Sequence, residues 1–454
     1  MTRIDNLIKK YDVPVPRYTS YPTVPCWDTK GFSNSQWRSA VERIFDETNA
    51  TKGVSLYIHL PFCESLCTYC ACNTRITRNH SVEGPYMNAL LREWELYRYI
   101  FGKRPLIREL HLGGGTPTFF SAENLKILIG KIVSGGDLYP GAEFSFEGHP
   151  NNTSFDHLKT LFECGFRRVS YGVQDLDPKV QKAINRIQPF ENLQNAVKKS
   201  REIGYESISF DLIYGLPYQT TNTIIATFRK VLQLKPDRVA FYSYAHVPWL
   251  KPGQRGYEDA NLPGDVEKRM LYETGRQLLS SEGYTDIGMD HFSLPHDELF
   301  KARTQGRLHR NFMGYTTSQT DLLIGLGASA ISDAKYAYAQ NIKTVEEYEA
   351  NILQDKLAVF KGHIQTAEDL HIKECILSIA CHGKLRNELL MEMQDETLTR
   401  KLKTMESEGI VKFAGEGMQV TDVGNAFIRN ICNTFDFRQQ MLGTSLEKTF
   451  SKSI

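Results

Sequence analysis

Short strand-like runs and helical patterns alternate along the first half of the chain, and this order restricts the possible folds most. The strand-like runs cover Val54–His59, Leu110–Leu112, Phe144–Glu147, Val169–Val173, Ile208–Tyr214 and Val239–Tyr244. Apolar residues three and four apart predict intervening helices at Tyr86–Tyr99, Ala122–Ile132, Phe155–Glu163, Glu191–Ile203 and Asn222–Leu234. This order implies parallel strands joined by right-handed crossovers, in a doubly wound sheet or a partial to full barrel.

The residues that follow the predicted strands favour the barrel. Each strand ends in polar or glycine-rich sequence that packing alone does not require: the loop at Cys63, Gly113–Thr116, Glu147, Gln174 with Asp175, Asp211, and Ala245 with His246. Active sites of parallel barrels lie at these carboxyl ends. We therefore predict an α/β fold built on a parallel, partial (β/α)6 barrel with its functional site at the mouth.

The chain divides into four predicted regions. An N-terminal arm covers residues 1–50, the barrel 51–300, an extension of the barrel 301–365, and a small, mainly helical module 366–454. In the last region, helical patterns precede a short hairpin pattern, which resembles a winged-helix fold; they lie at Leu385–Met393, Leu398–Glu408 and Val411–Val420.

Composition excludes several classes of protein. The 454 residues are 41% hydrophobic and 24% charged, enough for a large core, and the net charge of +1 gives no general attraction to nucleic acid or anionic membranes. The sequence contains no apolar run approaching the roughly 18 residues of a membrane span, and its start does not resemble a signal peptide. We expect a cytoplasmic protein without nucleic-acid partners. The absence of a long heptad pattern is consistent with a monomer.

Four of the nine cysteines lie between positions 63 and 72. The spacing Cys63-xxx-Cys67-xx-Cys70 places three thiolates on one loop, where they can bind three irons of a cubane cluster and leave the fourth iron for another ligand. The alternative is a zinc site with Cys72 as fourth ligand, although zinc sites usually use paired CxxC motifs. The other cysteines are expected to be small buried side chains: Cys26, Cys164, Cys375, Cys381 and Cys432.

Glycines and polar residues at the other strand ends suit a small cofactor. The run Gly113–Thr118 lets backbone amides approach a ligand, or forms a tight turn. Glu147 can pair with a cation or remain solvated, and Tyr69 can stack on an adenine or pack against the barrel.

Three further side chains carry hydrogen-bonding groups suited to a nucleoside and a carboxylate. Gln174 and Asp211 offer an amide and a carboxylate for ribose hydroxyls, and Arg186 can form a bidentate pair with a carboxylate. Structural hydrogen bonds and a surface salt bridge are the alternatives.

The motifs together resemble a known family. The cysteine loop, with Tyr69 and the preceding Tyr57–Phe62, is similar to the radical S-adenosylmethionine (SAM) superfamily. Further motifs resemble its oxygen-independent coproporphyrinogen III oxidases, also called coproporphyrinogen III dehydrogenases, over nearly the whole chain: Pro16–Thr23, Cys72, His111–Thr118, Gly172–Asp175, Asp211–Pro217, Tyr244–His246, Gly288–Phe292, His309–Phe312 and Ile428–Cys432.

The resemblance implies a reaction and its cofactors. In this family Cys63, Cys67 and Cys70 would be the catalytic, cluster-binding residues of a [4Fe-4S] centre, with SAM on the fourth iron. A 5′-deoxyadenosyl radical made from SAM then removes a β-hydrogen from a propionate of coproporphyrinogen III. Carbon dioxide and an electron leave, and two such steps give the vinyl groups of protoporphyrinogen IX. A low-potential electron donor and a separate acceptor are implied as partners.

The same resemblance assigns residues to two SAM sites and to the substrate. The first site would use Tyr57, Tyr69, Gly114, Gly115, Thr116, Glu147, Gln174, Arg186 and Asp211. A possible second SAM would lie against Ala245, Phe312 and Ile331, with Cys72 nearby. Cationic candidates for the substrate carboxylates are Arg17, His309 and Arg310.

The chain departs from the family pattern at two points. Met313 stands where the pattern has a glutamine, so an amide that would contact the second SAM is replaced by a thioether. After Glu147 the chain reads Gly148-His149-Pro150 where Val-Asp-Pro is more familiar, which leaves the glutamate in place. The alternative functions are those of relatives with the same cluster, which act as haem chaperones or in anaerobic haem utilisation.

Overall fold

Seven parallel strands form the middle of one twelve-stranded sheet in the computed structural model, which describes residues 3–393, 395–442 and 450–452. Six are the predicted ones: β1 (Val54–Leu60), β4 (Leu106–Gly114), β5 (Asp137–Gly148), β6 (Phe166–Gln174), β7 (Ser207–Tyr214) and β8 (Arg238–Ser243). The sequence did not predict the seventh, β13 (Leu323–Leu326), which pairs in parallel with β1.

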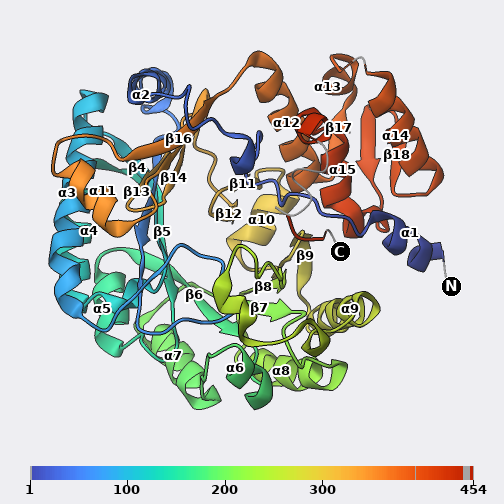
Figure 1. Cartoon of the computed structure of the whole chain (residues 1–454), viewed down its shortest axis with the longest axis horizontal. Coiled ribbons are helices and arrows are strands. Elements are labelled where there is room, and N and C mark those ends of the chain that lie inside the picture. Colours follow the sequence, from blue (N-terminus) through green and yellow to red (C-terminus); the bar gives the residue numbers. More distant parts are fainter. Residues whose placement is uncertain (1–2, 394, 443–449, 453–454) are drawn as a thin grey trace.

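Antiparallel strands extend the sheet at both ends. β14 (Ile331–Asp333), β15 (Ala337–Asn341) and β16 (Val359–Ile364) continue beyond β13, and β10 (His291–Ser293) and β9 (Thr285–Gly288) continue beyond β8. Because the sheet ends in two different strands, β16 and β9, it is an open, partial barrel as predicted (Figure 1).

Helices cover the outer face of the parallel strands (Figure 1). They are α3 (Glu83–Phe101), α4 (Ala122–Ser134), α5 (Phe155–Glu163), α6 (Pro178–Ala183), α7 (Phe190–Ile203), α8 (Thr221–Gln233) and α9 (Asp265–Ser281). Alternate residues of β1 face this layer and are fully buried: Val54, Leu56, Ile58 and Leu60. The main hydrophobic core therefore lies between strands and helices, outside the barrel.

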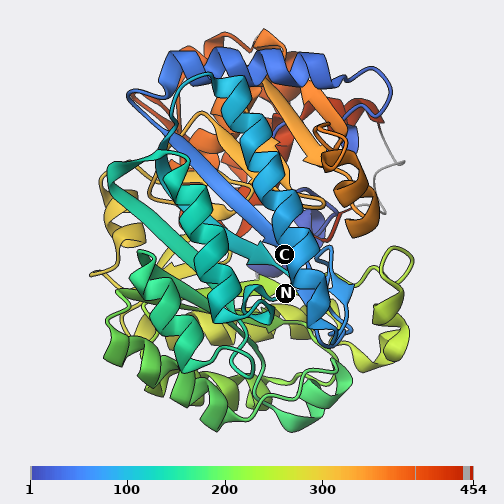
Figure 2. The ribbon, with the colours of Figure 1, turned by 90° about the vertical axis from the view of Figure 1, so that its left-hand side faces the viewer.

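The N-terminal arm packs against the C-terminal region rather than standing alone. Its helices are α1 (Arg3–Tyr11) and α2 (Asn34–Thr48), and α2 lies across one end of the molecule (Figure 2). Leu7, Tyr18 and Tyr21 share a hydrophobic core with the C-terminal helices, and Arg429 donates hydrogen bonds to the carbonyls of Val15 and Pro16. The first and last parts of the chain thus form one packed unit.

The C-terminal elements follow the order helix, strand, two helices and hairpin. They are α12 (Ala367–His382), β17 (Lys384–Arg386), α13 (Asn387–Met391), α14 (Glu396–Ser407), β18 (Val411–Ala414) and β19 (Gly417–Val420), followed by α15 (Ile428–Thr434) and α16 (Phe437–Leu442). The three strands pair in the order β17-β19-β18. This order is typical of winged-helix folds; the domain boundaries themselves stay a prediction.

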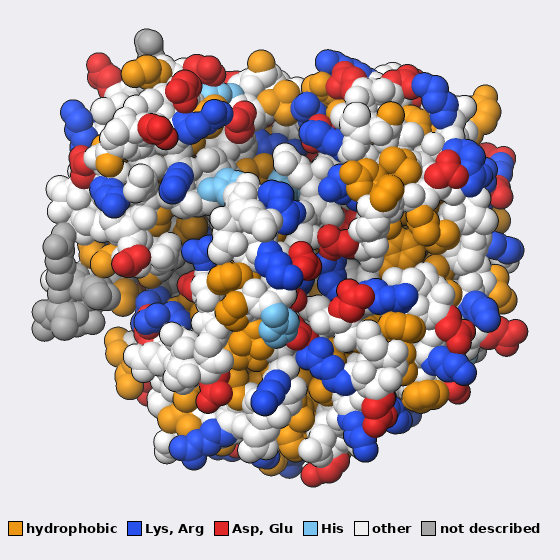
Figure 3. All heavy atoms as spheres, turned by 180° about the vertical axis from the view of Figure 1, so that it is seen from behind, with side chains coloured by type: hydrophobic (Ala, Val, Ile, Leu, Met, Phe, Trp, Pro, Cys, Tyr) orange, Lys and Arg blue, Asp and Glu red, His pale blue; other side chains and the backbone are white. Residues whose placement is uncertain are grey.

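Shorter elements complete the fold. They are β2 (Phe62–Cys63), β3 (Arg75–Ile76), α10 (Glu298–Thr304), β11 (His309–Asn311), β12 (Gly314–Thr316), α11 (Val345–Ile352), and 3-10 turns at Val24–Cys26, His80–Val82, Pro117–Phe119, Pro252–Gly256, Asp259–Asn261 and Gly424–Phe427. No helix among the described residues has the length and apolar character needed to cross a membrane. The face opposite to that in Figure 1 carries charges of both signs (Figure 3).

Candidate active site at the barrel mouth

The cysteine loop follows β1 and is fixed by hydrogen bonds from three neighbouring segments. The side-chain amide of Asn185 donates to the carbonyl of Leu66 (2.7 Å), and that of Gln254 donates to the carbonyl of Tyr69 (3.3 Å). The backbone amide of Thr68 donates to the carbonyl of Ile184 (3.0 Å). These contacts hold the loop over the carboxyl ends of the strands, where the sequence predicted it.

Two glycines at the end of β4 allow the loop to lie directly against the barrel. A Cβ atom on Gly115 would stand 2.6 Å from the carbonyl oxygen of Pro61, and one on Gly114, which has a φ of +116°, would stand 2.8 Å from the ring of His59. The Thr116 hydroxyl lies 3.4 Å from the Cys63 sulfur. Gly115 is thus required by the close approach of two backbone segments, and Gly114 by its positive φ and the nearby His59 ring.

The thiols of the loop differ in their acidity. Burial raises the pKa of Cys63 to about 11, whereas hydrogen bonding from Cys72 lowers the pKa of Cys70 to about 6. Among the described residues, no three His, Cys, Asp or Glu side chains converge closely enough to chelate a single ion.

Glu147 at the end of β5 is held in its charged form by its surroundings. Burial alone would raise the pKa of Glu147. Two contacts outweigh burial: His111 Nε2 lies 3.6 Å from Glu147 Oε1, and the backbone amide of Gly114 donates to the carboxylate. The pKa of Glu147 therefore lies below its usual value. His111 also stacks on Tyr57 and lies 2.8 Å from the Ser145 hydroxyl. His111 belongs to the motif His111–Thr118, but no role was predicted for it, although it lies two residues before Gly113 and so on the same face of β4.

Arg186 lies between the cysteine loop and the end of β6. Its Nη2 donates to the carbonyl of Gly172 (2.6 Å), and its Nη1 lies 3.6 Å from the Cys67 sulfur. Its Nε is buried and has no hydrogen-bond partner among the described residues. A Cβ atom on Gly172 would meet the side chains of Gln174 and Arg186, so this glycine provides space for both.

A cavity of about 560 Å³ unites most of the predicted site. Twelve of the predicted residues line it: Cys63, Cys67, Tyr69, Cys70, Cys72, Gly114, Gly115, Thr116, Glu147, Gln174, Arg186 and Asp211. They come from six different segments, yet they meet at the mouth because the strands are parallel. Tyr57 lies next to this set but does not line the cavity.

Below the mouth, the inside of the barrel is polar. A second cavity of about 160 Å³ shares Glu147, Asp211 and Tyr242 with the first and continues past Ser145, Ser170 and Ser209. Serines and an alanine, Ala240, occupy this level where many barrels place bulky apolar residues. Small side chains therefore leave the space open.

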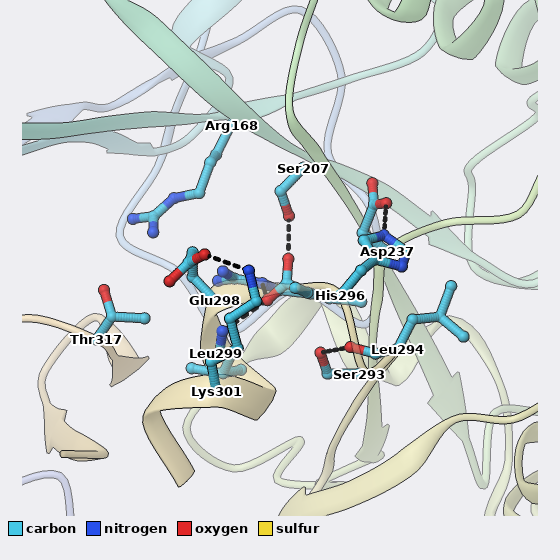
Figure 4. Close-up of polar contacts among 12 residues, drawn as sticks. Arg168, Ser207, Asp237, Ser293, Leu294, His296, Glu298, Leu299, Lys301 and Thr317 are labelled. Carbon is cyan, nitrogen blue, oxygen red and sulfur yellow. Dashed lines mark hydrogen bonds and ion pairs between the residues drawn. The ribbon is translucent and has the colours of Figure 1, made fainter. Parts of the chain in front are cut away.

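Polar and charged side chains line the opposite end of the barrel, where Figure 4 labels Arg168 and Ser207. Arg168 pairs with Glu143, and Asp297 accepts hydrogen bonds from Arg238 Nε (2.7 Å) and the Ser207 hydroxyl (2.7 Å). These contacts pair the charged groups at this end of the barrel.

Two predicted substrate residues, Arg17 and Arg310, lie between the barrel, the arm and the C-terminal region. Arg17 pairs with Asp290 and donates to the carbonyl of Ser243 (3.3 Å). Arg310 is 6% exposed, its Nη2 donates to the carbonyl of Arg17 (3.3 Å), and its Nε and Nη1 have no partner among the described residues. Burial, together with the charge of Arg310, lowers the pKa of His291 to about 3.

The remaining predicted residues lie elsewhere. His309 lines a separate cavity with Lys52, Asp321 and His382, because β11 turns it away from the mouth. Phe312 packs edge-on against Trp27 and Tyr338. Ala245 accepts a hydrogen bond from Gln254, and Ile331 pairs with Gln340; neither lines the mouth cavity.

The comparisons with known proteins agree with this architecture. The model of the Radical SAM superfamily matches residues 57–231. An "Oxygen-independent coproporphyrinogen III oxidase" of Synechocystis sp. is 35% identical and is aligned over 99% of this chain and 97% of its own length. A relative with the same name from Escherichia coli (strain K12) is 37% identical over 95% of this chain and 94% of its own length.

A solved structure extends the similarity to three dimensions. The coproporphyrinogen III oxidase HemN from Escherichia coli, described as a radical SAM enzyme, superposes with a TM-score of 0.87 at 35% identity and covers 94% of this chain and 100% of that one. The chain therefore belongs to the oxygen-independent coproporphyrinogen III oxidase family of the radical SAM superfamily.

Proposed function

We infer that this protein is a radical SAM oxidoreductase that decarboxylates two propionate side chains of coproporphyrinogen III to vinyl groups, giving protoporphyrinogen IX without oxygen. The observation that supports this most directly is the mouth cavity. It joins the three cysteines of the CxxxCxxC loop to Glu147, Arg186 and Asp211 in a chain that matches the family over nearly its full length. The chain binds a [4Fe-4S] cluster and SAM, as this family does.

The residues at the mouth fit these cofactors. The loop offers three thiols, and the unpartnered, buried Nε of Arg186 can donate to a carboxylate such as that of SAM. Gly114 and Gly115 line the same cavity as the cysteines. When bound, the cluster and SAM supply the one-electron and hydrogen-abstraction chemistry that oxidative decarboxylation needs.

We propose that the residues of this chain bind the cluster and SAM, orient them and shield them. Cys63, Cys67 and Cys70 hold the cluster, and Tyr57, Tyr69, Gly114, Gly115, Thr116, Glu147, Gln174, Arg186 and Asp211 surround SAM. Glu147, kept charged by His111, is suited to a cationic amino or sulfonium group. At the far end of the barrel, Arg168 pairs with Glu143 and Arg238 with Asp297.

Arg310 is our leading candidate for binding a substrate carboxylate. A buried guanidinium with two unused donors is costly unless an anion completes its hydrogen bonds. Arg17 lies beside it, on the arm. His309 occupies a different cavity, so we give it no role with the substrate.

The second SAM remains a proposal for Ala245, Cys72, Phe312 and Ile331. Met313 lines the inner cavity, and its thioether is a weak acceptor that cannot donate a hydrogen bond. We propose that a second SAM binds less tightly here than the first.

The surroundings of the enzyme are also inferred. All nine cysteines are free, which suits a reducing compartment, and we propose the cytoplasm. We further propose a monomer that receives electrons from a low-potential donor and passes them to a separate acceptor. Haem chaperones and haem-utilisation proteins share the cluster, but the names of the full-length relatives favour the decarboxylase.

The test is anaerobic reconstitution with iron and sulfide, followed by product analysis with coproporphyrinogen III. We expect two molecules of carbon dioxide for each protoporphyrinogen IX, together with 5′-deoxyadenosine. Cys67→Ser should lose the visible absorbance of the cluster, whereas the matched control Cys164→Ser, at the end of α5, should keep it. Tight haem binding without turnover would instead identify a chaperone.

A further inference from the structure

A second large cavity lies away from the barrel mouth, where the barrel meets the C-terminal helices. Its volume is about 450 Å³, which is within the range of small-molecule sites. Its lining comes from the segments before β1 and β13, from β11, from the turn between β14 and β15, and from α12 and α13. Among the described residues, it shares no lining side chain with the mouth cavity or the inner cavity. The proposed function leaves this separate cavity unused.

Positive charge exceeds negative charge in this cavity. Five Lys and Arg side chains line it, but only three carboxylates. Asp321 is shared by two lysines, because Lys52 Nζ lies 2.8 Å and Lys335 Nζ 3.7 Å from its Oδ2. Lys373 Nζ lies 2.8 Å from Asp333 Oδ2. Both aspartates are thus already paired, and an anion would neutralise the positive charge that remains.

Two histidines add hydrogen-bonding groups to the cavity wall. The rings of His309 and His382 make no hydrogen bond with any described residue. Burial, together with the charge of Lys373, lowers the pKa of His309 to about 4, so its ring is neutral at neutral pH and carries one N–H donor. Leu370 and Leu377 of α12 line the same cavity. Positive charge and free donors beside apolar side chains suit an organic anion.

The cavity is connected to the proposed substrate residue Arg310 through β11. His309 and Arg310 are neighbours in this strand and lie on opposite faces, so that His309 lines the cavity and Arg310 donates to the carbonyl of Arg17. β11 pairs with β12, where the Tyr315 hydroxyl donates to the carbonyl of Ala380 in α12 (2.8 Å). Because α12 also lines the cavity, an anion held there would contact both elements that position Arg310.

We propose that this cavity binds a small organic anion with at least two negative charges, through Lys335 and His309, and that the bound anion weakens substrate binding at Arg310. Phosphate esters and dicarboxylates share the required chemistry. An anion beside His309 places negative charge one strand away from the guanidinium that would receive a substrate carboxylate, so the two anions repel each other. Binding of the anion does not depend on the proposed function, whereas its effect on the substrate rests on it.

The experiment titrates the reconstituted holoenzyme by anaerobic calorimetry with two probes, ADP as the phosphate ester and succinate as the dicarboxylate. Lys335→Gln removes one charge of the cavity and leaves Asp321 paired with Lys52. A second variant, His309→Ala, removes the imidazole donor. The control, Lys356→Gln, removes an exposed charge just before β16 that does not line the cavity. KM for coproporphyrinogen III is measured with and without each probe.

We expect at least one probe to bind the wild type and the control at one site per chain, and the probe that binds identifies the ligand as a phosphate ester or a dicarboxylate. Lys335→Gln and His309→Ala should each weaken this binding about tenfold, because each loses a hydrogen bond to a charged group. A saturating probe should raise KM about fivefold or more in wild type and control. At the same probe concentration, the rise should be smaller in Lys335→Gln.

The proposal is overturned if neither probe binds saturably at millimolar concentrations, or if wild type and Lys335→Gln bind with equal affinity. A rise in KM that is the same in Lys335→Gln would show direct competition at Arg310 and contradict a separate site. Saturable binding without any change in KM would overturn the connection through β11. A failure of the proposed function is distinguishable, because the probe would then still bind although no protoporphyrinogen IX is formed.

Discussion

Asp211 and Glu147 lie inside the same barrel mouth, and burial together with the charge of Glu147 raises the pKa of Asp211 to about 7. Glu147 itself remains acidic because His111 pairs with it. The pKa values of these two neighbouring carboxyl groups are therefore shifted in opposite directions, up for Asp211 and down for Glu147.

The first prediction concerns stability against pH. Between about pH 4 and pH 7 the folded protein keeps a proton on Asp211 that the unfolded chain has released, so the stability of the fold falls as the pH rises through this window. Asp211→Asn removes this term, and we expect the variant to be about 1–3 kcal/mol more stable than wild type near pH 8 and equal near pH 4.

Urea unfolding of the protein without SAM, under anaerobic conditions, measures this difference. Asp137→Asn, on the exposed start of β5, is the control and should leave the pH profile unchanged. If wild type and Asp211→Asn lose stability in parallel from low to high pH, the assignment of the shifted group is wrong.

A second prediction concerns the contact between Gly115 and the cysteine loop. Gly115→Ala would place a methyl group 2.6 Å from the Pro61 carbonyl oxygen, so the loop must move. We expect iron content after reconstitution to fall at least about twofold and SAM binding to weaken about tenfold or more, since cluster and cofactor depend on the loop position.

Gly130→Ala is its matched control, because Gly130 lies in α4 and an added Cβ meets nothing within 4 Å. This change should stabilise the protein by about 0.5–1 kcal/mol through helix propensity. Full iron content and normal SAM affinity in Gly115→Ala would show that the close approach is not needed.

The third prediction assigns the substrate carboxylate to Arg310. Arg310→Ala should lower kcat/KM for coproporphyrinogen III by about 100-fold or more, because a charge-assisted pair is lost. SAM binding should be unchanged, since Arg310 does not line the mouth cavity. Arg310→Lys should recover part of the loss by restoring the charge without the planar fork.

Steady-state kinetics and equilibrium binding separate these effects, with the exposed neighbour Arg307→Ala as control. Thermal melting of each variant shows whether a kinetic loss comes from a destabilised fold. An Arg310→Ala variant with normal kinetics, or one whose loss is matched by Arg307→Ala, would remove Arg310 from the substrate site.

The fourth prediction concerns Met313. Replacing it with glutamine restores a hydrogen-bonding amide in the inner cavity, and we expect Met313→Gln to bind a second SAM about tenfold more tightly than wild type. Equilibrium dialysis with labelled SAM gives the stoichiometry. Met270→Gln, on the exposed side of α9, should behave as wild type; an unchanged second affinity in Met313→Gln would argue against this role.

The sequence predicted the six barrel strands and the mouth because both depend on local patterns. Strand periodicity and the residues after each strand are encoded in short segments. It did not predict β13, since Leu323–Leu326 becomes a parallel strand only through pairing with β1, more than 250 residues earlier.

The positions of Arg310 and His309 likewise follow from tertiary contacts. They are adjacent in one short strand, so alternation sends them to opposite faces, but which face meets the mouth depends on where β11 lies. His111 could have been found from the sequence by counting back two residues from Gly113 along the strand.

The packing of the arm onto the last helices has a consequence for synthesis on the ribosome. Leu7, Tyr18 and Tyr21 meet their partners on α12 and α15 only after almost the whole chain has been translated. Arg17 lies on the same arm, so it pairs with Asp290 only once the arm has packed. The core shared by the arm and the C-terminal helices is thus the last part of the fold that can form during synthesis.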